Sequence, residues 1–255
     1  MNATEIQSYL GERYSAYLEE LPSEDWAQGY QQFCERTRNI AGALDGEGRQ
    51  ALIDACGAAG VAGGLEVYLK EALYERYNGV TSLQQGGLSQ ENFNRVCRDD
   101  QFLIIFSRVL SLAKTHASAD DIYDDAIRWM EGFASRNKLN RFSAVLNRYF
   151  AGCLPGILTM IAAESHLRAL ITLFGPVGIP DLQSNWLTAN RALMTLLTQW
   201  LDGKQIDGDT KFRRSIFFWW LYENGLGGYE DHQVVYYGKV VEAALVDPIV
   251  FVPEV

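Results

Sequence analysis

Apolar side chains recur at steps of three and four residues along most of the chain, which is the spacing of helices that bury one face. The first such run covers about 6–21 and stops at Pro22, and Ser23 is suited to cap a second helix reaching about residue 40. Ser89 is a similar cap for a later one. The pattern predicts an all-α, multi-helix globular bundle, with further helices at about 49–56, 65–77, 90–98, 101–116, 119–135, 138–151, 156–163, 165–174, 184–201 and 210–223.

The end of the chain follows a different pattern. Residues 232–239 and 248–255 are rich in Val, Ile, Tyr and Phe, which favours one or two short strands near the C-terminus. A polar, glycine-bearing stretch at 79–88 indicates a loop. It favours two domains, an acidic helical part at 1–88 and a helical core with a basic middle and a short β-type tail at 89–255, while a single domain is also compatible with the chain length.

The charge of the chain is unevenly distributed. The 255 residues carry a formal net charge of -10, which weighs against a general nucleic-acid binder. Residues 133–220, however, hold 10 Lys or Arg against 5 Asp or Glu. This basic middle indicates either a surface that faces a polyanion or a solvated helix surface. If it binds nucleic acid, the candidate residues are those with high local positive density: Arg136, Lys138, Arg141, Arg148, Arg213 and Arg214.

One block resembles a known family. Residues 141–200 combine an aromatic-and-arginine helix, a Pro155 turn, a leucine ladder from Leu167, and a helix with Trp186 and Asn190 four residues apart. This order, together with the strand-like 233–238, resembles the N-terminal recognition region of McrB-type, modification-dependent restriction proteins. The resemblance implies binding of double-stranded DNA, modified or not, in a bacterial restriction or phage-defence system.

Further along, the chain departs from the family in one respect. After Gly238 the chain reads KVVEAALVDP, with no G-x-x-x-x-G-K-[ST] loop to cradle phosphates. No nucleotide cofactor is therefore expected, and the resemblance implies a non-catalytic adaptor whose motor or nuclease subunit is a separate partner.

Two other functions remain open. Asp181, Asp209 and Lys211 occur in the order of a PD-(D/E)xK nuclease site, in which two carboxylates hold Mg²⁺. A turn rich in Asp and Gly explains the same residues without catalysis. The acidic first hundred residues would alternatively suit a protein-interaction module of the inhibitor or immunity type that binds a basic partner.

The remaining reactive residue types lack metal-site spacing. Cys34, Cys56, Cys97 and Cys153 form no CxxC pair and are expected as buried free thiols, which indicates a reducing, cytoplasmic setting. The longest apolar region, 149–163, is interrupted by Pro155 and is too short to cross a membrane. The aromatic run 217–222 favours a buried helix. No metal ligand is expected among the three histidines (His116, His166 and His232) or at the acidic helix start (Asp120, Asp121, Asp124 and Asp125).

Overall fold

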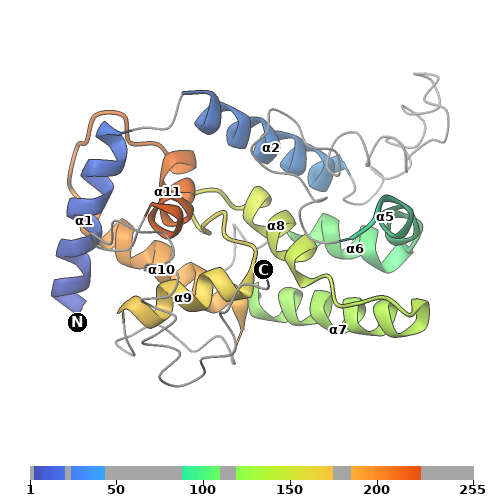
Figure 1. Cartoon of the computed structure of the whole chain (residues 1–255). Coiled ribbons are helices and arrows are strands. Elements are labelled where there is room, and N and C mark those ends of the chain that lie inside the picture. The colour runs from blue at the N-terminus through green and yellow to red at the C-terminus, as the bar shows by residue number, and fades with distance from the viewer. Residues whose placement is uncertain (1–2, 21–23, 44–87, 110–118, 175–184, 225–255) are drawn as a thin grey trace. The chain divides into compact units, whose positions relative to one another are not determined.

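The computed structural model describes residues 3–20, 24–43, 88–109, 119–174 and 185–224, and the α-helix is their regular element throughout (Figure 1). The predicted all-α fold is thereby confirmed. The predicted helices at about 49–56 and 65–77 and the predicted C-terminal strands lie outside the described residues. The helices are α1 (Ala3–Glu19), α2 (Glu24–Ala43), α5 (Gln90–Cys97), α6 (Asp100–Arg108), α7 (Ala119–Asn137), α8 (Ser143–Cys153), α9 (Glu164–Phe174), α10 (Trp186–Leu201) and α11 (Lys211–Glu223).

The chain divides into two compact units. One joins Met1–Leu21 to Gly156–Val255, so it is built from both ends of the sequence, and the other is Pro22–Pro155. We call them the terminal unit and the central unit. The boundary expected at residue 88 stays a prediction, because residues 44–87 just before it lie outside the described part of the chain.

In the terminal unit, α1 packs against α10 and α11, and α9 packs against the same two helices (Figure 1). The buried side of α1 includes Tyr14 and Tyr17, whose rings contact Phe217 of α11. Gly11 lies directly beneath the indole of Trp200, where a β-carbon would overlap the ring. The missing side chain therefore lets α1 and α10 approach closely.

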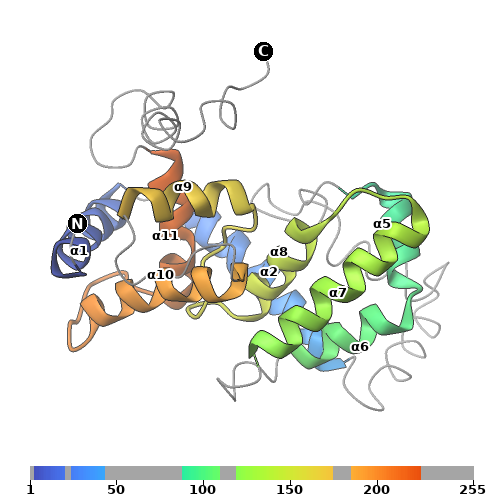
Figure 2. The same ribbon diagram turned by 90° about the horizontal axis from the view of Figure 1, so that it is seen from below.

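In the central unit, α8 packs against α2 and α7, and α6 packs against α2, α5 and α7 (Figure 2). The ring of Phe106 on α6 stacks on that of Tyr149 on α8, with centroids 3.4 Å apart and planes at 12°. The buried Tyr149 hydroxyl donates to the Phe106 carbonyl at 3.2 Å, so its polar end is satisfied inside the core. The cap predicted at Ser89 is confirmed, since its Oγ accepts from the Asn92 N–H.

The helix predicted at about 156–163 is wrong, because these residues form an irregular buried segment between α8 and α9. Its backbone N–H and C=O groups form hydrogen bonds with residues of α10 and α11. Asn190 Oδ1 accepts from the Thr159 N–H at 2.7 Å, and Asn190 Nδ2 donates to the Ile161 carbonyl at 3.2 Å. The Met160 N–H donates to the Ser215 carbonyl at 2.9 Å. These bonds replace those of a helix, so the segment can be buried without being helical.

In the part of the chain that the structure describes, no helix is both long enough and apolar enough to cross a bilayer.

Candidate nucleic-acid interface

Three of the six predicted nucleic-acid-binding residues lie together where α7 ends. Arg136 is in the last turn of α7, and Lys138 and Arg141 follow it before α8 begins. Their side chains are exposed, Arg136 by 66% and Arg141 by 60%. We use the name α7–α8 loop for residues 135–141, which comprise the last residues of α7 and the first part of the connection to α8. The loop brings three cations together on the surface of the central unit.

The α7–α8 loop has a defined backbone turn. The Lys138 N–H donates to the Ser135 carbonyl at 3.3 Å, and the Leu139 N–H donates to the Ala134 carbonyl at 2.9 Å. This pair of bonds ends a helix with one left-handed residue, and Lys138 takes that place with φ of 55°. The turn explains why α8 begins at Ser143 rather than near 138 as predicted.

Two carboxylates contact the arginines of the loop. Arg136 Nη2 lies 4.0 Å from Asp99 Oδ2, and Arg141 Nη2 lies 3.0 Å from Glu131 Oε1. Both acids come from outside residues 133–220, so the positive excess of that stretch is partly offset in space. Exposed ion pairs of this kind contribute about 0–1 kcal/mol, which leaves the arginines available to a competing phosphate.

Asp99 and Glu131 differ in how firmly they are held. Asp99 Oδ1 accepts from the Gln101 N–H at 2.9 Å, which caps α6, and from Trp129 Nε1 at 3.1 Å. Asp99 therefore has a structural role that is independent of Arg136. Glu131 projects from α7 and is 51% exposed.

Arg148, a fourth predicted residue, does not share this exposure. It lies on α8 and is mostly buried, and burial lowers its pKa to about 10. The guanidinium still carries its charge at neutral pH, but it belongs to the interior of the central unit more than to its surface.

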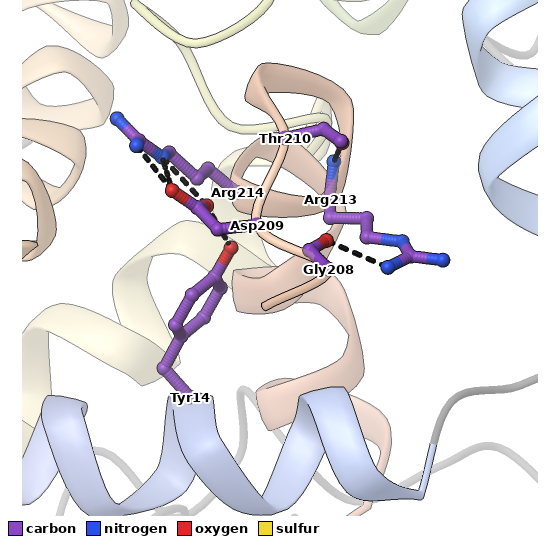
Figure 3. Close-up of polar contacts among 6 residues, drawn as sticks. All are labelled: Tyr14, Gly208, Asp209, Thr210, Arg213 and Arg214. Carbon is purple, nitrogen blue, oxygen red and sulfur yellow. Dashed lines mark hydrogen bonds and ion pairs between the residues drawn. The ribbon is translucent and has the colours of Figure 1, made fainter. Parts of the chain in front are cut away.

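Arg213 and Arg214 belong to the terminal unit, where both are bound to the turn that precedes α11 (Figure 3). Arg214 Nε donates to Asp209 Oδ1 at 2.8 Å and to Oδ2 at 3.1 Å, and its Nη2 also contacts Oδ2. Arg213 Nη1 donates to the Gly208 carbonyl at 2.6 Å. Thr210 Oγ1 caps the helix by accepting from the Arg213 N–H at 3.2 Å. Both side chains thus stabilise the turn from which α11 begins.

Tyr14 completes this cluster from α1, since its hydroxyl donates to Asp209 Oδ1 at 2.6 Å (Figure 3). Burial would raise the pKa of Asp209, but the hydrogen bonds from Arg214 and Tyr14 outweigh it and lower that pKa. Burial and the bond to Asp209 raise the pKa of Tyr14, which keeps the phenol protonated. Tyr14 could not be assigned to a polar cluster from the sequence, because its signal there is a position on the apolar face of a helix.

The cluster assigns Asp209 a structural role. Both of its oxygens face Arg214 or Tyr14, which leaves the carboxylate poorly placed for Mg²⁺. Lys211 is exposed, with its ammonium 5.0 Å from the ring centroid of Phe212. Asp181, the other nuclease candidate, lies outside the described residues. Within the described ranges, no group of three or more His, Cys, Asp or Glu side chains could hold a metal ion.

Several other predicted features are part of the core. Trp186 and Asn190, which belong to the family resemblance, are both buried, and the aromatic run of α11 buries Phe217, Phe218, Trp220 and Leu221. Cys34, Cys97 and Cys153 are buried and outside any disulfide, as expected, and Cys56 lies outside the described residues.

The other candidate ligands are engaged in packing or pairing. The ring of His166 stacks on that of Tyr222, with centroids 4.3 Å apart, while His116 and His232 lie outside the described residues. At the start of α7, Asp125 pairs with both Arg108 and Arg128.

Comparison with known proteins found no match for this chain among protein-family models, curated proteins or solved structures. The resemblance to McrB-type recognition regions therefore stays a prediction. Residues that carry it, among them Leu167, Trp186 and Asn190, are buried. The block also crosses the division between the two units at Pro155. Its pattern therefore follows core packing, which many unrelated helical proteins share.

Proposed function

We propose that this protein is a non-catalytic recognition or adaptor protein that binds double-stranded DNA through the α7–α8 loop. The observation that carries the proposal is the exposure of Arg136, Lys138 and Arg141 within six residues of chain. No acidic residue occurs between 132 and 163, so the segment itself adds no charge that would repel phosphate.

The three cations suit the phosphate backbone in different ways. The two guanidinium groups can each offer two parallel N–H donors to a phosphate, whereas Lys138 acts as a point charge. The turn at Lys138 fixes the backbone from which they project, which reduces the entropy that binding would cost. Contacts of this kind position a protein on DNA without reading its sequence.

The setting within a restriction or phage-defence system rests on the resemblance of residues 141–200 alone. In that setting the protein would deliver DNA, modified or unmodified, to a separate motor or nuclease subunit. Such a division of labour accords with the absence of a phosphate-cradling loop after Gly238.

The test is fluorescence anisotropy of a labelled DNA duplex, with and without modified cytosine, across a salt series with Mg²⁺ present. We expect binding that weakens as salt rises, and Arg136→Ala should reduce it. Arg128→Ala is the matched control, because Arg128 is an arginine of α7 that is 71% exposed and paired with an acid. It should leave binding within about twofold of the wild type.

Each alternative function has its own outcome in this test. Absence of binding at low salt would refute the proposal. It would favour the protein-interaction module that binds a basic partner, since α1 exposes the acidic residues Glu12 and Glu19. If the wild type cleaves the duplex and Asp209→Ala abolishes this cleavage, the result would instead support the nuclease hypothesis.

A further inference from the structure

One of the three cations of the proposed DNA-binding surface, Arg141, forms an ion pair with Glu131. We infer that Glu131 is an intramolecular competitor that occupies Arg141 until a phosphate displaces it. This inference rests on the proposed function and adds a control of its affinity, in which one carboxylate of the protein restrains polyanion binding.

The geometry singles out Glu131 as that competitor. Its Oε1 lies 3.0 Å from Arg141 Nη2, and both side chains are more than half exposed. Among the described residues, Arg141 is the charged group that this carboxylate contacts. Asp99 is a poor candidate for the same role, because its bonds to Gln101 and Trp129 hold it in place whether or not Arg136 is occupied.

The competition has a physical consequence for binding. When DNA binds the wild type, Arg141 exchanges one anion for another, so a phosphate gains little from that contact. If Glu131 is neutral, Arg141 is free beforehand and its contact with phosphate adds fully to binding. Each phosphate neutralised by a cation steepens the dependence of log K on log salt by about 0.9.

The experiment compares Glu131→Gln with the wild type in the duplex anisotropy assay across the salt series. We expect Glu131→Gln to tighten binding by about two- to fivefold, the range that corresponds to loss of an exposed ion pair. The slope of log K against log salt should change little, because Arg141 contacts a phosphate in both proteins once DNA is bound. The glutamine keeps the size of the side chain, so the fold should be unaffected.

A control is needed because Glu131→Gln also makes the whole protein less negative. Glu91→Gln makes the same change of charge in the same unit, and it too breaks an exposed pair, since Glu91 Oε1 lies 3.4 Å from Arg95 and is 80% exposed. The double variant Glu131→Gln/Arg141→Ala tests the mechanism, because the gain should vanish once the freed arginine is removed.

The outcomes separate the two proposals. A gain in Glu131→Gln that exceeds Glu91→Gln and disappears in the double variant supports the competitor role. Equal effects of Glu131→Gln and Glu91→Gln, with a wild type that binds, overturn the competitor role and leave the proposed function standing. Absence of duplex binding by every variant at low salt overturns both.

Discussion

Replacing Asn190 with Ala should destabilise the terminal unit more than any surface substitution on the same helix. Asn190 is buried on α10, and its amide holds the irregular segment that runs through Thr159 and Ile161. The substitution removes both an acceptor and a donor from a site that is closed to water.

The magnitude follows from the groups left behind. The Thr159 N–H and the Ile161 carbonyl would lose the partners that lie 2.7 and 3.2 Å away. A buried polar group without a partner costs about 1–3 kcal/mol, so the two together cost about 2–6 kcal/mol. Alanine recovers only about 0.5 kcal/mol through its higher helix propensity, so the loss of hydrogen bonds decides the sign.

Urea unfolding followed by tryptophan fluorescence would measure this change. Four of the six tryptophans belong to the terminal unit, so the signal reports mainly on that unit. Thr195→Ala is the matched control on α10, because Thr195 is exposed and its hydroxyl donates to the Arg191 carbonyl of the same helix. It should change the free energy of unfolding by less than about 0.5 kcal/mol.

An Asn190→Ala protein whose free energy of unfolding stays within about 0.5 kcal/mol of the wild type would refute this prediction. That result would mean that the segment obtains its hydrogen bonds elsewhere. Hydrogen exchange gives an independent reading, because the Thr159 amide should lose protection in Asn190→Ala and keep it in Thr195→Ala.

Three further predictions concern turns and packing. Gly11→Ala should lower stability by about 1–3 kcal/mol in a thermal melt, because its new methyl group overlaps the Trp200 ring; an unchanged melting temperature would contradict the close approach of α1 and α10. Lys138→Gly should raise stability by up to about 1 kcal/mol by relieving the left-handed backbone, while weakening DNA binding; a loss of stability would contradict the turn. The pKa of Asp209 is lowered below its ordinary value of 3.8, so its pairing with Arg214 stabilises the protein above about pH 4 and is lost as pH falls through the lower folded value. Urea midpoints of Asp209→Asn and wild type should therefore converge as the pH falls below about 4, and a constant gap would contradict the pairing.

The fold class could be predicted from the sequence because helical periodicity and capping residues are local signals. Ser89 is an example, since the bond it accepts comes from an amide only three residues away. The segment 156–163 was wrongly predicted as a helix because its apolar residues can be buried in a helix and in an irregular segment alike. Its actual conformation depends on Asn190 and Ser215, which reach it from later helices. The joining of both chain ends in the terminal unit is equally non-local.

The candidate surface could likewise be predicted only where its residues are close in sequence. Arg136, Lys138 and Arg141 are close in sequence, so their cluster could be anticipated from charge alone. Their carboxylate partners could not, because Asp99 reaches Arg136 from the start of α6 through tertiary packing. For the same reason, the sequence predicts Arg214 as a binding residue, although the Asp209 carboxylate already pairs with it and is itself held by the Tyr14 hydroxyl.

The measurement that tests the central claim most directly is the salt dependence of duplex binding in the wild type and in an Arg136→Ala/Lys138→Ala/Arg141→Ala variant. If the α7–α8 loop contacts phosphates, the plot of log K against log salt should become shallower by up to about 2.7 in the variant, or about 0.9 for each lost contact. Binding should fall at every salt concentration. A variant with the affinity and slope of the wild type would contradict the account, since it would place any DNA contact away from this loop.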